Sequence, residues 1–191
     1  PTLDEEEAVA RALLIGDSIR MAYAGGVAQG LRGLVDIVEI PENGGDSANL
    51  LAKAPGWLDA VDPDTIDIAH VNCGLHDIKR PFASAERQVD LSAYTVNVRA
   101  ILSLVRERVG GQVIWASSTP VVYERHHVRK GFDRFDADVI EYNAAADAVA
   151  RELGVATHDL YAAIAEDGVA ECVGADGVHM TLRGNDLLVD R

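Results

Sequence analysis

Basic residues are scarce in this sequence of 191 residues, which has 17 Lys and Arg against 31 Asp and Glu and a formal net charge of −14. This deficit argues against a protein that binds the phosphate backbone of nucleic acids or docks on an anionic membrane surface. No apolar run approaches the roughly 20 residues that a membrane-spanning helix needs. The acidic start, residues 1–7, lacks the basic and then apolar pattern of a signal peptide. We therefore predict a cytoplasmic protein and, because Pro1 is not an initiating residue, expect further sequence upstream.

Cysteine is also scarce, since the chain has only Cys73 and Cys172. Two cysteines cannot form a disulfide framework or a four-thiolate zinc site, and we predict buried free thiols. Internal repeats, low-complexity tracts and linkers are absent, while 48% apolar and 25% charged residues are typical of a folded protein. These features predict one domain over residues 1–191 with a core large enough to fold unaided.

Short apolar runs alternate with longer amphipathic stretches along the chain. The runs predict buried strands at residues 11–15, 34–40, 66–72, 112–117 and 155–159, and the clearest stretches predict helices at 92–109, 136–153 and 181–189. This alternation predicts an α/β fold in which helices cover both faces of a parallel sheet. Ligands of such sheets bind beyond the carboxyl ends of the strands, so the residues that follow each strand are the candidate site.

The first candidate is Ser18, in Gly16-Asp17-Ser18 directly after the first predicted strand. A serine hydroxyl becomes a nucleophile when a neighbouring base takes its proton, and a helix N-terminus presents N–H groups to an anion. Serine is also a common helix cap, so the tripeptide alone leaves both interpretations open. A second Gly-Asp-Ser stands at residues 45–47, where we interpret Ser47 as the cap of a helix over residues 48–53.

A second candidate is the pair Asp176 and His179 near the end of the chain. Two intervening residues on a loop let the carboxylate fold back onto the imidazole, where it holds Nδ1–H and leaves Nε2 to accept a serine proton. The alternative is an Asx-type turn followed by a surface histidine. A zinc site is less favoured because no third ligand stands at a recognisable spacing.

Two further loops offer donors for the oxyanion of an acyl-transfer intermediate. Gly45 follows the second predicted strand, and a glycine lets its N–H approach a substrate closely. Residues 74–77 follow the third strand and offer the side chain of His76 as another donor. The pair Gly44 and Gly45 is equally consistent with a tight turn.

Taken in order along the chain, these blocks resemble those of the SGNH (GDSL-type) hydrolase family. The matching residues are Gly16-Asp17-Ser18-Ile19, Gly45, Gly74-Leu75-His76-Asp77 and Asp176 with His179, with supporting similarity at Thr119-Pro120 and Tyr142-Asn143. The resemblance covers nearly the whole chain, and four blocks in register are far more specific than any one of them. The chain is therefore identified as a member of this family.

The resemblance implies a three-layer α/β/α, flavodoxin-like fold with a five-stranded parallel sheet in the order 2-1-3-4-5. It implies Ser18 as nucleophile, His179 as base and then acid, and Asp176 as the residue that orients His179. The N–H groups of Ser18 and Gly45, together with His76, would form the oxyanion hole. It implies neither a metal nor an organic cofactor. The Gly-x-Ser-x-Gly elbow of α/β-hydrolases, which share the order Ser, Asp, His, is absent.

His76 departs from the family pattern, which has Asn at this position. An Asn amide always donates, whereas a neutral imidazole donates from only one nitrogen, so His76 can replace it if Nε2 carries the proton. Asp77 or a backbone carbonyl could instead hold that proton elsewhere. The open interpretations are a working substitute, which we favour because the triad is otherwise intact, a slow enzyme, or a site adapted to other chemistry.

The segment 123–135 is the longest polar connection and is expected either to cover an acyl or alcohol pocket or to form a solvated loop. Its basic residues, in an acidic protein, suggest anionic or sugar-acid substrates. Asp159 is interpreted as a helix cap, His70 and His158 as structural, and Trp57 and Trp115 as packing residues.

We predict a serine esterase that hydrolyses small, acetyl-type esters, with acylated carbohydrates as candidate substrates, through an acyl-enzyme on Ser18. The partner is then a small-molecule ester, with neither nucleic acid nor membrane involved. One alternative is an acyltransferase or a thioesterase or lysophospholipase-type member, which differs in the group that accepts or carries the acyl chain. Another is a catalytically weak ligand-binding module of the same fold, which His76 favours and the intact triad opposes.

Overall fold

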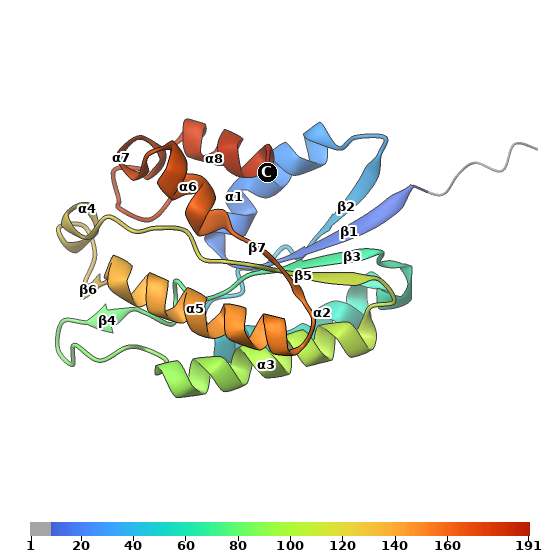
Figure 1. The fold of residues 1–191 in the computed structure, drawn as a ribbon, viewed down its shortest axis with the longest axis horizontal. Helices are drawn as coiled ribbons and strands as arrows, with labels where there is room; N and C mark the ends of the chain where they lie inside the picture. Colours follow the sequence, from blue (N-terminus) through green and yellow to red (C-terminus); the bar gives the residue numbers. More distant parts are fainter. Residues whose placement is uncertain (1–8) are drawn as a thin grey trace, which may run out of the picture.

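The computed structural model describes residues 9–191 and is built around a parallel sheet of five strands (Figure 1). Its strands are β1 (Ala10–Ile15), β2 (Val35–Glu39), β3 (Ile68–Val71), β5 (Gln112–Ala116) and β7 (Ala156–His158). Their order in the sheet is β2-β1-β3-β5-β7, and every pair is parallel. This is the predicted five-stranded sheet in the order 2-1-3-4-5. The acidic start, on which the prediction of no signal peptide rests, lies outside the described residues.

Helices cover both faces of the sheet, which completes the predicted three layers (Figure 1). One face carries α2 (Ser47–Val61), α3 (Leu91–Arg108) and α5 (Asp136–Glu152), and the other carries α1 (Ser18–Gly30), α6 (Leu160–Asp167), α7 (Val169–Cys172) and α8 (Leu182–Val189). A short 3-10 helix, Pro63–Thr65, precedes β3. None of the helices in the described part of the chain combines the length and apolar character needed to cross a membrane.

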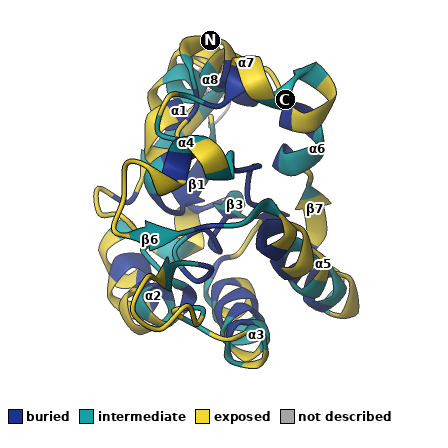
Figure 2. Cartoon of the chain, turned by 90° about the vertical axis from the view of Figure 1, so that its left-hand side faces the viewer, coloured by how far each residue is buried: buried dark blue, intermediate teal, exposed yellow. Residues whose placement is uncertain are grey.

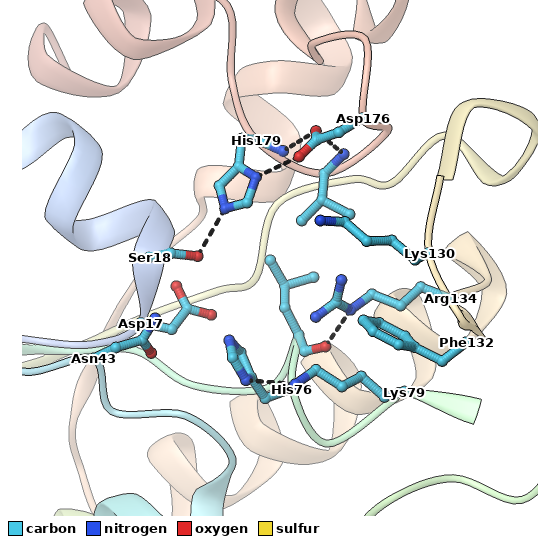
Figure 3. A pocket seen from close by; sticks show the side chains of 12 residues that line it. Asp17, Ser18, Asn43, His76, Lys79, Lys130, Phe132, Arg134, Asp176 and His179 are labelled. Atoms are coloured by element: carbon cyan, nitrogen blue, oxygen red, sulfur yellow. Dashed lines mark hydrogen bonds and ion pairs between the residues drawn. The ribbon is translucent and has the colours of Figure 1, made fainter. Parts of the chain in front are cut away.

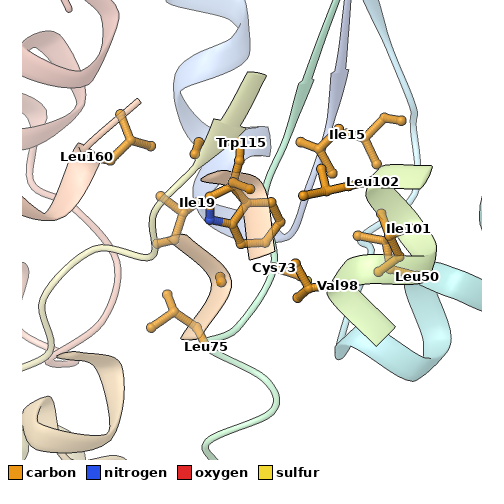
Figure 4. Packing of buried hydrophobic residues seen from close by; sticks show 14 of the residues in the cluster. Ile15, Ile19, Leu50, Cys73, Leu75, Val98, Ile101, Leu102, Trp115 and Leu160 are labelled. Atoms are coloured by element: carbon orange, nitrogen blue, oxygen red, sulfur yellow. The ribbon is translucent and has the colours of Figure 1, made fainter. Parts of the chain in front are cut away.

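The core lies between the sheet and the helices on each side. Because both faces of the sheet are covered, β1 is a nearly continuous apolar run whose last four residues are all buried. Helix α3 buries the stripe that its spacing predicts: Tyr94, Val98, Ile101, Leu102 and Val105. Trp115 is fully buried among such side chains (Figure 4). Each Ile or Leu buried in this way stabilises the fold by about 1.5–3 kcal/mol.

A second, much smaller sheet closes over the carboxyl edge of the main sheet. It consists of β4 (Arg80–Pro81) and β6 (Phe132–Asp133), which pair antiparallel, and α4 (Tyr123–His127) lies beside β6. Figure 2 looks onto this edge, with α4 and β6 in front of β1 and β3. We call this pairing the clasp, because it joins the loop that follows β3 to the loop that follows β5.

Two salt bridges anchor the clasp to α5. Arg80 and Arg87, in and beyond β4, both bind the buried carboxylate of Asp138. Burial alone raises the pKa of Asp138, but the two guanidinium groups outweigh it, and the net effect lowers that pKa. Asp138 therefore stays ionised and holds the β4 side of the clasp in place.

The helix caps differ in one place from those expected. Asp159 caps α6 as predicted, because its side chain accepts a hydrogen bond from the amide of Ala162. The prediction for Ser47 was wrong, since Asp46 caps α2 and Ser47 is its first residue. The carboxylate of Asp46 accepts from the N–H of Asn49, a role that aspartate fills as well as serine does.

Candidate active site

Three side chains from opposite ends of the chain form a hydrogen-bonded series at the carboxyl edge of the sheet (Figure 3). The Oγ of Ser18 lies 2.9 Å from Nε2 of His179, and Nδ1 of His179 lies 2.6 Å from Oδ2 of Asp176. A carboxylate can only accept, so Nδ1 carries the ring proton and Nε2 is left to accept from the serine hydroxyl. The structure brings together all three side chains that the sequence predicts as nucleophile, base and orienting acid.

The loop before α8 holds Asp176 in position. Its Oδ1 accepts the backbone N–H groups of Val178 and His179, at 3.1 and 2.9 Å. Burial works to raise the pKa of Asp176, but the hydrogen bond from the His179 ring and these two amides lower it to about 2. The carbonyl oxygen of Asp176 accepts a hydrogen bond at 3.3 Å from Nδ1 of His126, a buried residue of α4. The carboxylate is therefore ionised and fixed at every ordinary pH.

Ser18 stands at the first position of α1. Asp17 precedes it and caps the helix by accepting the N–H of Ile19 at 2.9 Å. Within the part of the chain that the structure describes, the N–H of Ser18 has no hydrogen-bond partner, as expected for the first turn of a helix. Both the hydroxyl and the N–H of Ser18 are thus available at this edge, and Asp17 rather than Ser18 supplies the cap.

Gly45 lies in the neighbouring loop, where its N–H is already engaged. It donates to Oδ1 of Asn43 at 2.9 Å, and its φ of 66° belongs to the left-handed region that favours glycine. Asn43 lines the pocket next to Ser18. For Gly45 to donate to an oxyanion, the side chain of Asn43 has to turn aside. The role of Gly45 in the oxyanion hole stays a prediction.

His76 faces the same pocket from the loop after β3 (Figure 3). Its Nδ1 lies 2.9 Å from Nζ of Lys79, three residues further along the same turn. A protonated lysine can only donate, so Nδ1 is the acceptor and the ring proton resides on Nε2. Burial, together with the charges of Lys79 and Arg134, lowers the pKa of His76 to about 4. His76 is therefore neutral, with one N–H, in the tautomer that a donor at this position requires.

Asp77, next to His76, binds Ser47 of the second Gly-Asp-Ser instead of fixing the position of the proton on the His76 ring. It accepts both the N–H and the hydroxyl of Ser47, and Ser47 is fully buried. Burial raises the pKa of Asp77 to about 7, against the lowering effect of these hydrogen bonds. The second tripeptide is thus a structural joint between two site loops, which agrees with the choice of Ser18 over Ser47.

These residues surround a pocket of about 270 Å³ with two different sides. One side, the serine wall, consists of Ser18, Asp176 and His179. The opposite side, the cationic wall, consists of Lys79, Lys130 and Arg134, all of which line the pocket beside Phe132. The clasp supplies this second wall, since Lys79 precedes β4, while Lys130 and Arg134 flank β6. His76 lies between the two walls.

The segment 123–135 covers the pocket, as one of its two interpretations expected, with α4 and β6 inside it. Sequence reasoning singled out its basic residues but missed Lys79, Asn43 and the buried support from His126. The three-residue spacing from His76 to Lys79 was the one available signal for that contact. No cluster of three metal-ligating side chains occurs within residues 9–191.

Residues that were assigned structural roles have them. His70 and His158 bond to each other at 3.1 Å between ring nitrogens, away from the pocket. Trp57 and Trp115 are buried in the core. Cys73 and Cys172 are buried free thiols.

Comparison with known proteins identifies the family and the fold of this chain. A model of the GDSL-like lipase/acylhydrolase family matches residues 14–187. No curated protein matches the sequence. Among solved structures, LAE5, an alpha/beta hydrolase enzyme from the metagenome of Lake Arreo, Spain, superposes with a TM-score of 0.77 at 17% identity, over 96% of this chain and 94% of that chain.

Two further structures with the same fold are acetyl xylan esterases. The acetyl xylan esterase AlAXEase gives a TM-score of 0.74 at 16% identity, over 94% of this chain and 96% of that one. Axe2, an acetylxylan esterase from Geobacillus stearothermophilus, gives 0.71 at 19% identity, over 95% and 91%. At these identities the likeness establishes the shared fold.

Proposed function

Because the chain belongs to the GDSL-like lipase/acylhydrolase family of hydrolases, we propose that Ser18 is the nucleophile of an esterase that acts on small acyl esters. The observation that carries this proposal is the Ser18–His179–Asp176 series, with 2.9 and 2.6 Å between the bonded atoms. It is the geometry in which a base can take the serine proton while a carboxylate stabilises the imidazolium that forms.

The reaction has two halves. The Oγ of Ser18 attacks the ester carbonyl carbon while Nε2 of His179 takes its proton, and the carbonyl oxygen becomes an oxyanion. The intermediate collapses to an acyl-enzyme, and His179 returns the proton to the departing alcohol. Water then attacks the acyl carbon, losing a proton to His179. The second intermediate collapses to release the acid, and His179 returns that proton to the Oγ of Ser18.

The oxyanion needs donors placed before the reaction begins. The free N–H of Ser18 supplies one, and Nε2–H of His76 supplies a second, in place of the asparagine of the family pattern. The hydrogen bond from Lys79 to Nδ1 supports this role, because it fixes the tautomer of His76. Gly45 becomes a third donor if Asn43 releases its N–H.

Small acyl groups are favoured by the size and character of the pocket. A volume of about 270 Å³ lies below the range of roughly 300–1,000 Å³ typical of sites for drug-sized ligands. Its lining is largely charged or polar, which suits an acetyl ester of a hydroxylated compound better than a long hydrocarbon chain. The fold itself accommodates acetylated carbohydrates, since AlAXEase and Axe2 share it.

The proposal is tested by p-nitrophenyl acetate hydrolysis with wild-type protein, Ser18→Ala and Ser47→Ala. Loss of a triad nucleophile costs on the order of 10⁴–10⁶-fold in kcat, and we expect this for Ser18→Ala. Ser47→Ala is the matched control from the second Gly-Asp-Ser, and its folded fraction should keep turnover within about tenfold of wild type. Equal background rates in wild type and Ser18→Ala would refute the esterase. Acetylated sugars and longer acyl chains then define the substrate, and added alcohols reveal acyl transfer.

A further inference from the structure

Arg134 is a buried cation that makes no salt bridge within residues 9–191. Its side chain is 5% exposed and follows directly on the clasp strand β6. Its Nε donates to the carbonyl oxygen of Leu75 at 2.6 Å, and within residues 9–191 this is its one hydrogen bond. Burial lowers the pKa of Arg134 to about 10, partly offset by the charges of Asp17 and Asp176. A buried charge is ordinarily paired with an opposite charge. The absence of a salt bridge to Arg134 among the described residues therefore indicates that an anionic ligand pairs with it.

The free end of Arg134 points into the pocket. Figure 3 shows its guanidinium between His179 on one side and His76 on the other, with both terminal nitrogens toward the cavity. The backbone bond of Nε fixes the plane of the guanidinium, and its terminal N–H groups form the fork that binds a carboxylate or phosphate by two parallel hydrogen bonds. Phe132 supports the group, with the guanidinium carbon 5.0 Å from the ring centroid.

The two carboxylates that line the pocket do not fill this role. Asp176 is held by the His179 ring and two amides. Asp17 caps α1 through Oδ1, and its Oδ2 is buried without a hydrogen-bond partner among the described residues, so its charge acts on Arg134 from beyond salt-bridge distance. Within the described chain, no carboxylate oxygen lies within 4.0 Å of a terminal nitrogen of Arg134, Lys130 or Lys79. The cationic wall thus presents positive charge to a ligand in a protein whose net charge is −14.

We propose that this pocket selects esters that carry an anionic oxygen group, a carboxylate or a phosphate, close to the ester bond, and that Arg134 binds this group with Lys130 at the rim. The inference rests on the proposed esterase for the reaction itself, but the anion site stands on the geometry of the cationic wall. It names a substrate class narrower than small acyl esters in general: acylated hydroxy acids such as acylated sugar acids, half-esters of dicarboxylic acids, and acyl esters that carry a phosphate.

Binding tests the anion site independently of turnover. In Ser18→Ala protein, calorimetry with 3-hydroxybenzoate and 3-hydroxybenzamide compares a carboxylate with its neutral counterpart, and 3-hydroxyphenyl phosphate tests the other anion. Losing a charge-assisted hydrogen bond typically costs roughly tenfold to a hundredfold in affinity. We expect a preference of this size for at least one anion, and its loss when Arg134→Gln is added. Arg129→Gln removes an exposed charge outside the pocket and should preserve the preference.

Rates of hydrolysis then show whether the anionic group belongs to the alcohol side or to the acyl side of the ester. The ratio of kcat/KM for 3-acetoxybenzoate to that for 3-acetoxybenzamide reports a charge on the alcohol side. Mono-p-nitrophenyl glutarate against p-nitrophenyl butyrate reports a charge on the acyl side. At least one ratio should exceed about ten in wild type and fall by about tenfold in Arg134→Gln.

Folding of Arg134→Gln is checked by circular dichroism, and Lys130→Gln on the exposed rim provides a second variant. Its expected effect on the ratio is about threefold, since an exposed charge pair contributes less. Equal binding of the carboxylate, the phosphate and the amide by Ser18→Ala protein, or an unchanged preference in both variants, would overturn the anion site. If no ester is hydrolysed while the carboxylate or phosphate still binds through Arg134, the esterase fails and the anion site stands.

Discussion

The two walls of the pocket are built on opposite principles. In the serine wall, each side chain has a hydrogen-bond partner within the protein, and the carboxylate of Asp176 alone accepts three hydrogen bonds. In the cationic wall, Arg134 and Lys130 have terminal nitrogens for which no carboxylate lies within 4.0 Å among the described residues. Side chains that are already hydrogen-bonded to one another are preorganised for a reaction. Cations without a carboxylate partner are instead available to bind a ligand. The difference separates the residues that do chemistry from those that choose the substrate.

Asp176→Asn is the sharpest way to break the serine wall. An amide at this position can donate to Nδ1 of His179 and so force the ring proton onto Nε2, where it blocks acceptance of the Ser18 proton. We expect kcat for p-nitrophenyl acetate to fall by about 10³–10⁴-fold, with little change in the melting temperature. Because the pKa of Asp176 is about 2, the loss should be the same at pH 5 and pH 8. A loss that disappears at either pH would contradict this role.

His76 lies where the walls meet, so its replacement tests to which of them it belongs. His76→Ala removes an oxyanion donor and is expected to lower kcat by about 10²–10³-fold, while His76→Asn restores the family donor to within about tenfold of wild type. If both variants instead raise KM and leave kcat unchanged, His76 belongs with substrate binding and not with the oxyanion.

The pH–rate profile tests the same residue in the wild type. The folded-state pKa of His76, about 4, lies below its ordinary value of 6.5, so the ring is neutral above this pH and gains a proton as the pH falls through it. When Nδ1 is protonated as well, it can no longer accept the hydrogen bond from Lys79, and two positive charges lie next to each other. Wild type should therefore show an acid limb near pH 4 that His76→Asn lacks. Identical acid limbs would remove His76 from the oxyanion hole.

Lys79→Met gives the smallest of these effects. It tests two roles of Lys79, which lowers the pKa of His76 and fixes the tautomer of that ring. Lys79 is one of the groups that lower the pKa of His76, so its loss should move the acid limb to higher pH. It also frees the His76 tautomer, which we expect to lower kcat a few-fold, on the order of 1 kcal/mol. Lys130→Gln, a control from the same wall without the His76 contact, should leave the limb in place. A limb that does not move in Lys79→Met would contradict the contact.

The serine wall was predictable from the sequence because short blocks specify it. Ser18 stands just after β1, whose apolar run locates the end of that strand, and Asp176 and His179 stand in a short turn. The prediction that Ser47 caps α2 was wrong because Asp46 and Ser47 are both good cap residues. Only the tertiary contact between Ser47 and Asp77 decides between them.

The cationic wall was harder to predict because the clasp has no sequence period. Its strands are two residues long, too short for alternation, and they pair across some fifty residues of chain. The burial of Arg134 is invisible in a segment that is otherwise polar. The engagement of Gly45 by Asn43 depends on one side-chain rotamer, which no spacing rule predicts.

The clasp also makes the pocket adjustable through protein engineering. It pairs only Arg80 with Asp133 and Pro81 with Phe132, and the loops on either side of this pairing run over the surface. Residues can therefore be inserted into the exposed segments 82–86 or 128–131 to deepen or narrow the entrance, while the serine wall keeps its supports in α1, the loop before α8 and His126 of α4. A library of variants confined to these two segments would test new substrates while Ser18, His179 and Asp176 stay unchanged.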